Sequence, residues 1–86
     1  MARMIDLRIH HYNTDDVLTL KLPSDTKTKD LNPYIYEYNF APFQKPGYFF
    51  LYMDHLMGLE HKLEDYIPED AEAMEVRLLN VPYILI

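Results

Sequence analysis

The chain has no cysteine and only two glycines among its 86 residues. Without cysteine, these residues can form neither a disulfide nor a thiolate metal site, which agrees with a reducing compartment. The two glycines, Gly47 and Gly58, are isolated, so no glycine-rich loop is available to cradle a phosphate. The single serine, Ser24, is not set in a nucleophile elbow. We therefore expect neither an enzyme nor a cofactor-binding protein.

Basic residues are also few. The chain has eight Lys and Arg residues and fourteen Asp and Glu residues, which gives a formal net charge of −6. Because nucleic-acid binding needs clustered cations, and anionic lipids repel an acidic protein, neither is an expected partner. The longest apolar runs, 48–53 and 81–86, are far shorter than the roughly 20 residues of a spanning helix. The N-terminus shows no hydrophobic signal region. We expect a cytoplasmic protein that is not inserted in a membrane.

Four histidines are candidate metal ligands: His10, His11, His55 and His61. His10 and His11 are neighbours on a predicted strand, so their side chains point to opposite faces. The other two lack the i, i+4 spacing that would bring them together on a helix. We expect surface histidines and no metal site.

The residues that are present predict a packed core, because 49% are apolar and 14% are aromatic. Residues 4–11 alternate between apolar and polar side chains, with Ile5, Leu7 and Ile9 on one face. Residues 17–22 alternate in the same way. The polar residues 13–16 between them favour a turn. This pattern predicts a β-hairpin.

Residues 30–40 carry two conflicting patterns. Leu31, Ile35 and Tyr38 recur at helical spacing, whereas the aromatic residues from 34 to 40 alternate as in a strand. A helix that starts at Asp30, or after an Asn32 cap, would place Pro33 in the first turn, where proline is tolerated. The local pattern leaves helix and strand open.

The remaining elements follow from proline, glycine and apolar runs. We expect a rigid loop over 41–47, a strand over 48–53, a turn over 54–58, a short edge strand over 59–63 and a last strand over 74–79. With a helix over 30–40, this order predicts an α+β fold, in which one helix packs across one face of a mixed sheet of four or five strands. The first and last strands would lie parallel at the sheet centre, as in a β-grasp.

Three motifs carry a resemblance to ubiquitin. They are Pro23-Ser-Asp-Thr26 after the hairpin, the turn His61-Lys-Leu-Glu-Asp-Tyr66, and the alternation of Met74, Val76 and Leu78. In order and spacing they span about residues 4–79, and the resemblance favours a helix over 30–40. It also implies that Leu63 enters the core and that Tyr66 pins the preceding loop.

A narrower resemblance is to the YukD/EsaB-type small proteins of bacterial type VII (WXG100) secretion systems. It lies in His11-Tyr-Asn13, in Leu20-Lys-Leu-Pro23 and in Leu63-Glu-Asp-Tyr-Ile67, followed by an acidic loop. The resemblance implies a cytosolic accessory or regulatory component that binds parts of the secretion machinery. A small self-associating structural or phage-type β-grasp protein is the alternative.

Residues 80–86 form an apolar extension after the predicted domain of residues 1–79. Ubiquitin-type modifiers and sulfur carriers need a C-terminal pair of glycines, because only an unhindered glycine carboxylate threads into the activating enzyme. Here the last residues are Tyr83-Ile-Leu-Ile86, which are bulky. We expect a protein that is not conjugated to others.

The strand over 48–53 is apolar on both faces, and only one face can pack on the helix. One of two sets of residues must face away from the helix: Phe49, Leu51 and Met53, or Tyr48, Phe50 and Tyr52. Exposed apolar surface of this kind is typical of an interface. The extension could cover this face as a lid or added strand, or it could share in a binding or self-association surface. We predict a protein-contact set made of Phe49, Leu51, Met53, Tyr83 and Ile84, with Arg77 as its polar rim.

Overall fold

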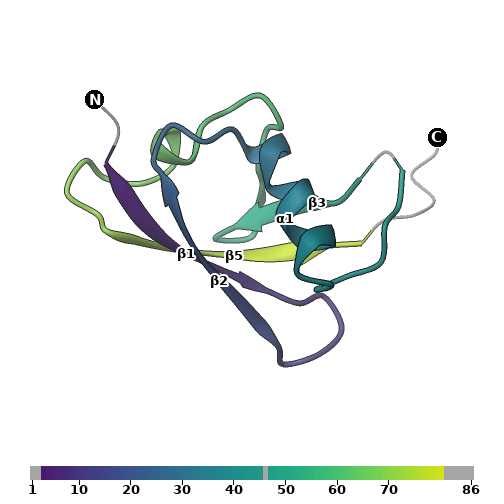
Figure 1. The fold of residues 1–86 in the computed structure, drawn as a ribbon. Helices are drawn as coiled ribbons and strands as arrows, with labels where there is room; N and C mark the ends of the chain where they lie inside the picture. Colours follow the sequence, from purple (N-terminus) through teal and green to yellow (C-terminus); the bar gives the residue numbers. More distant parts are fainter. Residues whose placement is uncertain (1–2, 46, 81–86) are drawn as a thin grey trace.

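The computed structural model describes residues 3–45 and 47–80. Its elements, in chain order, are β1 (Met4–His10), β2 (Val17–Pro23), the 3₁₀ turn η1 (Thr28–Leu31), α1 (Asn32–Glu37), β3 (Phe49–Tyr52), β4 (His55–Leu56), the 3₁₀ turn η2 (Leu63–Asp65) and β5 (Ala73–Leu79). The strands form one sheet in the order β2-β1-β5-β3-β4. β1 and β5 are parallel neighbours at its centre, and α1 lies across one face (Figure 1). The predicted α+β β-grasp is confirmed.

Residues 28–37 are helical, so the strand alternative for this segment is wrong. The helical stretch begins at Thr28, earlier than predicted, as one 3₁₀ turn that continues into α1. Pro33 lies in the first turn of α1, as expected. Leu31 and Ile35 are fully buried, but Tyr38 ends the helix and is 56% exposed, so it does not extend the core stripe.

The predicted edge strand over 59–63 is also wrong, because the edge strand is β4. Tyr52 pairs with His55, so the chain reverses in two residues and the edge strand begins at once. Residues 59–63 run beside η1 instead. There the Leu59 carbonyl accepts a hydrogen bond from the Lys29 amide at 3.0 Å, and the His61 carbonyl accepts one from Thr28 at 2.9 Å.

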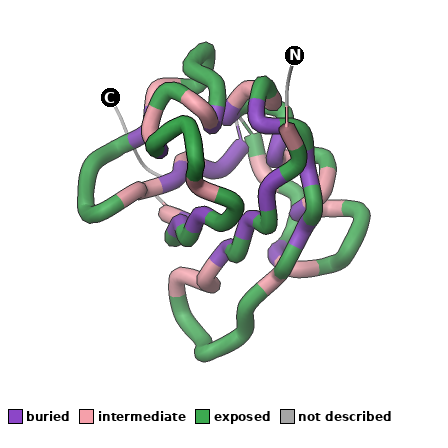
Figure 2. Tube along the Cα trace, turned by 90° about the vertical axis from the view of Figure 1, so that its left-hand side faces the viewer, coloured by how far each residue is buried: buried purple, intermediate pink, exposed green. Residues whose placement is uncertain are grey.

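The core lies between the sheet and α1, and the alternation of buried and exposed residues along the strands is visible in Figure 2. It includes the predicted residues of β1 and β5, together with Leu63 from η2. The hydroxyl of Tyr66 accepts a hydrogen bond from the Gly58 amide at 2.7 Å. Tyr66 therefore pins the loop before β5, as the resemblance to ubiquitin implied.

Tyr48 joins α1 to the start of β3 and is only 2% exposed. Its hydroxyl donates a hydrogen bond to the Pro42 carbonyl at 2.7 Å. Its backbone amide donates to Asn32 Oδ1 at 2.8 Å, and Asn32 Nδ2 donates back to the Tyr48 carbonyl at 3.3 Å. Asn32, predicted as a helix cap, thus serves as a clasp between the helix and the sheet. The neighbouring Gly47 has φ +119° and lies against the Asn32 side chain, which leaves little room for a Cβ.

Burial of Tyr48 predicts a loss of stability at alkaline pH. Burial, with a smaller effect of the neighbouring Tyr12 hydroxyl, raises the pKa of Tyr48 from 10.0 to about 12. Since the unfolded chain ionises this group first, its contribution is complete below pH 10 and is lost as the pH rises to 12, by roughly 2–3 kcal/mol. Urea titrations at pH 9 and pH 12 should show this loss. The variant Tyr48→Phe should lose less stability over the same range than Tyr38→Phe, and an equal loss in both would refute the assignment.

Candidate interaction surface

The face of the sheet opposite α1 is the open face. Because Ile5, Leu7 and Ile9 point to the core, the alternate residues of β1 project to this side, and Glu75 and Arg77 of β5 do the same. On β3, Phe50 is fully buried, and Phe49 and Leu51 point away from the core and are partly exposed. The structure therefore selects the first of the two predicted alternatives for this strand.

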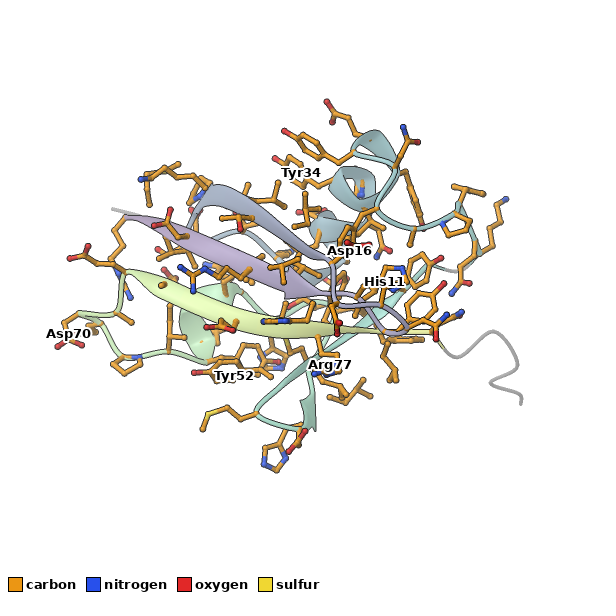
Figure 3. The ribbon with its side chains drawn as sticks, turned by 90° about the horizontal axis from the view of Figure 1, so that it is seen from below. His11, Asp16, Tyr34, Tyr52, Asp70 and Arg77 are labelled. Atoms are coloured by element: carbon orange, nitrogen blue, oxygen red, sulfur yellow. The ribbon has the colours of Figure 1, made fainter. Side chains whose placement is uncertain are left out.

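A shallow depression of about 310 Å³ lies on the open face where β5 meets the hairpin of β3 and β4. Three of the six predicted contact residues line it: Leu51, Met53 and Arg77. Leu51 is the cross-strand neighbour of Arg77, whose position in the sheet is labelled in Figure 3. The depression is completed by four further residues, namely His10, Asp54, Glu75 and Val76.

The carboxylate of Glu75 lies between the side chains of a histidine and an arginine. His10 Nε2 lies 2.7 Å from Glu75 Oε1, and Arg8 Nη1 lies 3.5 Å from Oε2. The hydrogen bond to His10 is the main reason why the pKa of Glu75 lies below its usual value, so the carboxylate is ionised at neutral pH. These groups are exposed, and their contribution to stability is therefore small.

Among the described residues, Arg77 forms no salt bridge. The open face carries Arg8, Lys21 and Arg77 together with Asp6, Asp54 and Glu75, so its charges balance, whereas the chain as a whole has a net charge of −6. A guanidinium without a partner among the described residues, in a depression that Leu51 and Met53 also line, can bind a carboxylate or a carbonyl of a partner.

Met53 is exposed at the tip of the β3–β4 hairpin in an unfavourable backbone conformation. Met53 has φ +50° and Asp54 has φ +67°, and they form the two-residue turn between the paired residues Tyr52 and His55. Such turns favour Asn-Gly, because side chains with a Cβ are disfavoured at positive φ. Met53 is 73% exposed and Leu56 is 60% exposed. The hairpin therefore presents two apolar side chains to solvent next to Leu51.

The structure separates the other predicted residues from this depression. Phe49 lies in a different groove, beside α1. Tyr83 and Ile84 lie outside the described residues, as does nearly all of the extension over 80–86. Leu56 was missed because residues 54–58 were assigned to a turn. The tight pairing of Tyr52 with His55 is the feature that would have revealed it.

His10 and His61 contact different carboxylates. His10 pairs with Glu75, and His61 Nδ1 lies 3.6 Å from Asp65 Oδ2. Within residues 3–45 and 47–80, no three His, Asp or Glu side chains are arranged to hold a metal ion. Over the same residues, no helix is long and apolar enough to cross a membrane.

Comparison with solved structures identifies the fold. Ubiquitin of Caldiarchaeum subterraneum superposes with a TM-score of 0.72 at 10% identity, covering 95% of this chain and 99% of that one. A chain from a structure described as molecular mimicry of SUMO that promotes DNA repair gives 0.67 at 18% identity, covering 90% and 91%. The N-terminal ubiquitin-like domain of the 4931431F19Rik protein gives 0.69 at 11% identity, covering 96% and 80%.

No family model matches the sequence, and no curated protein matches it either. At these identities the structural similarity establishes the fold alone. The chain has a ubiquitin-like fold.

Proposed function

We propose that this ubiquitin-like chain acts by binding another protein through its open face, without catalysis and without being conjugated to its partner. The exposed Met53 carries the proposal. Its positive φ costs on the order of 1 kcal/mol, and burial offsets little of that cost, because Met53 is 73% exposed. A strained, exposed apolar residue beside Leu51 and Arg77 is explained by contact with a partner.

The absence of conjugation is supported by the positions of the glycines. Gly47 contacts the Asn32 clasp and Gly58 donates its amide to Tyr66, so each has a structural role. The 86 residues contain no adjacent pair of glycines. Nothing in the proposed function requires a catalytic residue, a cofactor or a metal.

We further propose that the partner is a cytoplasmic component of a type VII secretion system, for which this chain is an accessory or regulatory protein. Support comes from the YukD/EsaB-type motifs, two of which occupy defined places in the fold. Leu20-Lys-Leu-Pro23 ends β2, and Leu63-Glu-Asp-Tyr-Ile67 contains η2. Genes for a secretion ATPase and WXG100 proteins beside the gene of this chain would be expected. A neighbourhood of phage structural genes would favour the self-associating alternative.

The experiment that tests the open face uses Met53→Asn. Asn is better tolerated than Met at positive φ, so the free energy of unfolding should rise by about 1 kcal/mol. Affinity for the cytosolic domain of the secretion ATPase should fall about tenfold, because an apolar contact is lost. Urea titration and calorimetric binding measurements would report the two changes.

The matched control is Asn39→Gly, which relieves a positive φ of +54° in the turn after α1, away from the depression. It keeps the Met53 side chain and should therefore keep the affinity. If Met53→Asn binds as tightly as the wild-type chain, Met53 is not a contact residue and the proposal loses its main support.

A further inference from the structure

A second apolar site lies beside α1, apart from the open-face depression. This aromatic groove, of about 340 Å³, runs between the start of α1, the loop over 43–45 and the start of β3. Its apolar lining consists of Pro33, Tyr36, Phe43, Phe49 and Leu59. None of these residues lines the open-face depression. The groove is therefore a separate site from the one on which the proposed function rests.

The walls of the aromatic groove are held in place by hydrogen bonds. The Tyr36 hydroxyl donates to the Gln44 carbonyl at 3.1 Å, and Gln44 Nε2 donates to the Gly47 carbonyl at 3.2 Å. The ring centroids of Tyr36 and Phe43 are 4.9 Å apart. Phe43 is nevertheless 67% exposed. A preformed apolar groove with an exposed aromatic ring on its rim is typical of a binding site.

The described backbone groups at the start of β3 are already bonded. The Tyr48 amide donates to Asn32 Oδ1 at 2.8 Å, and the Tyr48 carbonyl accepts from Asn32 Nδ2 at 3.3 Å. Phe49 pairs with β5, and the Phe50 carbonyl accepts a hydrogen bond from the Met57 amide at 2.8 Å. An extended segment therefore cannot add to the sheet here through its main chain. A ligand in the groove must be recognised through its side chains.

The charged side chains that line the groove are both cationic. They belong to Lys29 and Lys45, and none of the described lining residues is acidic. Lys29 Nζ lies 2.9 Å from Glu60 Oε2, and Lys27 Nζ lies 3.3 Å from Glu60 Oε1, so two lysines share one carboxylate and one positive charge remains. Lys45 is exposed and forms no salt bridge within the described part of the chain. Although the chain has a net charge of −6, this groove attracts an acidic ligand rather than a basic one.

We propose that the aromatic groove binds a segment of a partner protein in which an aromatic or aliphatic side chain stands next to acidic residues. The apolar side chain packs against Phe43 and Phe49, and a neighbouring carboxylate pairs with Lys45. This binding goes beyond the open-face proposal, because it gives the chain a second, separate site for a protein segment.

Selection from a library of random peptides displayed on phage tests the chemistry of the ligand. With the full chain as bait, the enriched peptides should carry an aromatic or aliphatic residue next to Asp or Glu. With Lys45→Glu as bait, acidic peptides should no longer be enriched, because the new carboxylate repels them. A synthetic peptide of the enriched sequence should bind this variant about tenfold more weakly, as measured by calorimetric titration.

Lys21→Glu is the matched control, because it changes the net charge equally at an exposed position of β2 that does not line the groove. It should bind the peptide as tightly as the wild-type chain does. Phe43→Ser should bind the peptide about tenfold more weakly, because an apolar contact is lost. Leu51→Asp should leave the affinity unchanged, which separates this proposal from the open-face one.

Four results would each overturn the proposal: no enriched peptide, enriched peptides without acidic residues, an equal loss of affinity in Lys21→Glu, or a loss in Leu51→Asp. Sedimentation velocity of the chain alone tests a second copy as the occupant. A wild-type dimer that Lys45→Glu and Phe43→Ser both dissociate would assign the groove to self-association instead.

Discussion

Asn32→Ala is expected to lower the free energy of unfolding by about 3 kcal/mol, because it leaves two buried backbone groups without partners. The amide and the carbonyl of Tyr48 both bond to the Asn32 side chain, at 2.8 and 3.3 Å. Tyr48 is 2% exposed, so water does not easily replace these bonds. Urea titration would measure the loss, with an unchanged m-value if unfolding remains two-state.

The control is the same substitution at Asn13, an exposed residue of the β1–β2 connection. It should change stability by less than about 0.5 kcal/mol. A loss of under 1 kcal/mol in Asn32→Ala would show that the clasp does not hold the start of β3 to α1.

Leu51→Asp is expected to weaken binding of the partner by about thirtyfold or more, the effect of losing a central contact of 2 kcal/mol. Leu51 lines the open-face depression, with Arg77 opposite it on β5. An Asp at this position would also compete with the partner for the Arg77 guanidinium. Calorimetric titration with the cytosolic domain of the secretion ATPase is the measurement, and circular dichroism would verify that the variant is folded.

Tyr38→Asp is the matched control, because it places the same charge on an exposed aromatic position at the end of α1. Equal affinities in the two variants would exclude the open face as the binding surface. If the self-associating alternative is correct, sedimentation velocity should show a wild-type dimer that Leu51→Asp converts to monomer. The ATPase domain would then bind neither protein.

The buried residues of the strands were predictable, because a strand with one buried face has an apolar side chain at every second position. Ile5, Leu7 and Ile9 are buried as predicted, and so are Met74, Val76 and Leu78. For residues 30–40 the local pattern left helix and strand open, because the aromatic residues alternate while Leu31, Ile35 and Tyr38 recur at helical spacing. Only the resemblance to ubiquitin favoured the helix.

The site was less predictable, because it depends on which strands become neighbours. Leu51 and Met53 were predicted as contact residues from their alternation, and Arg77 from its place on β5. His10 and Glu75 are 65 residues apart, and only the parallel pairing of β1 with β5 brings them together. Phe49 follows the same alternation as Leu51, yet it lines a different groove, together with Asn32 and Tyr36 of α1.

The parallel pairing of β1 with β5 also has a consequence for biosynthesis. Asp6 pairs with Ala73 and His10 with Arg77, so the first strand synthesised gains its central partner only when nearly the whole chain has been made. A β1–β2 hairpin alone is at best marginally stable in water. At 5–20 residues per second, the nascent chain spends several seconds with the apolar side of this hairpin uncovered.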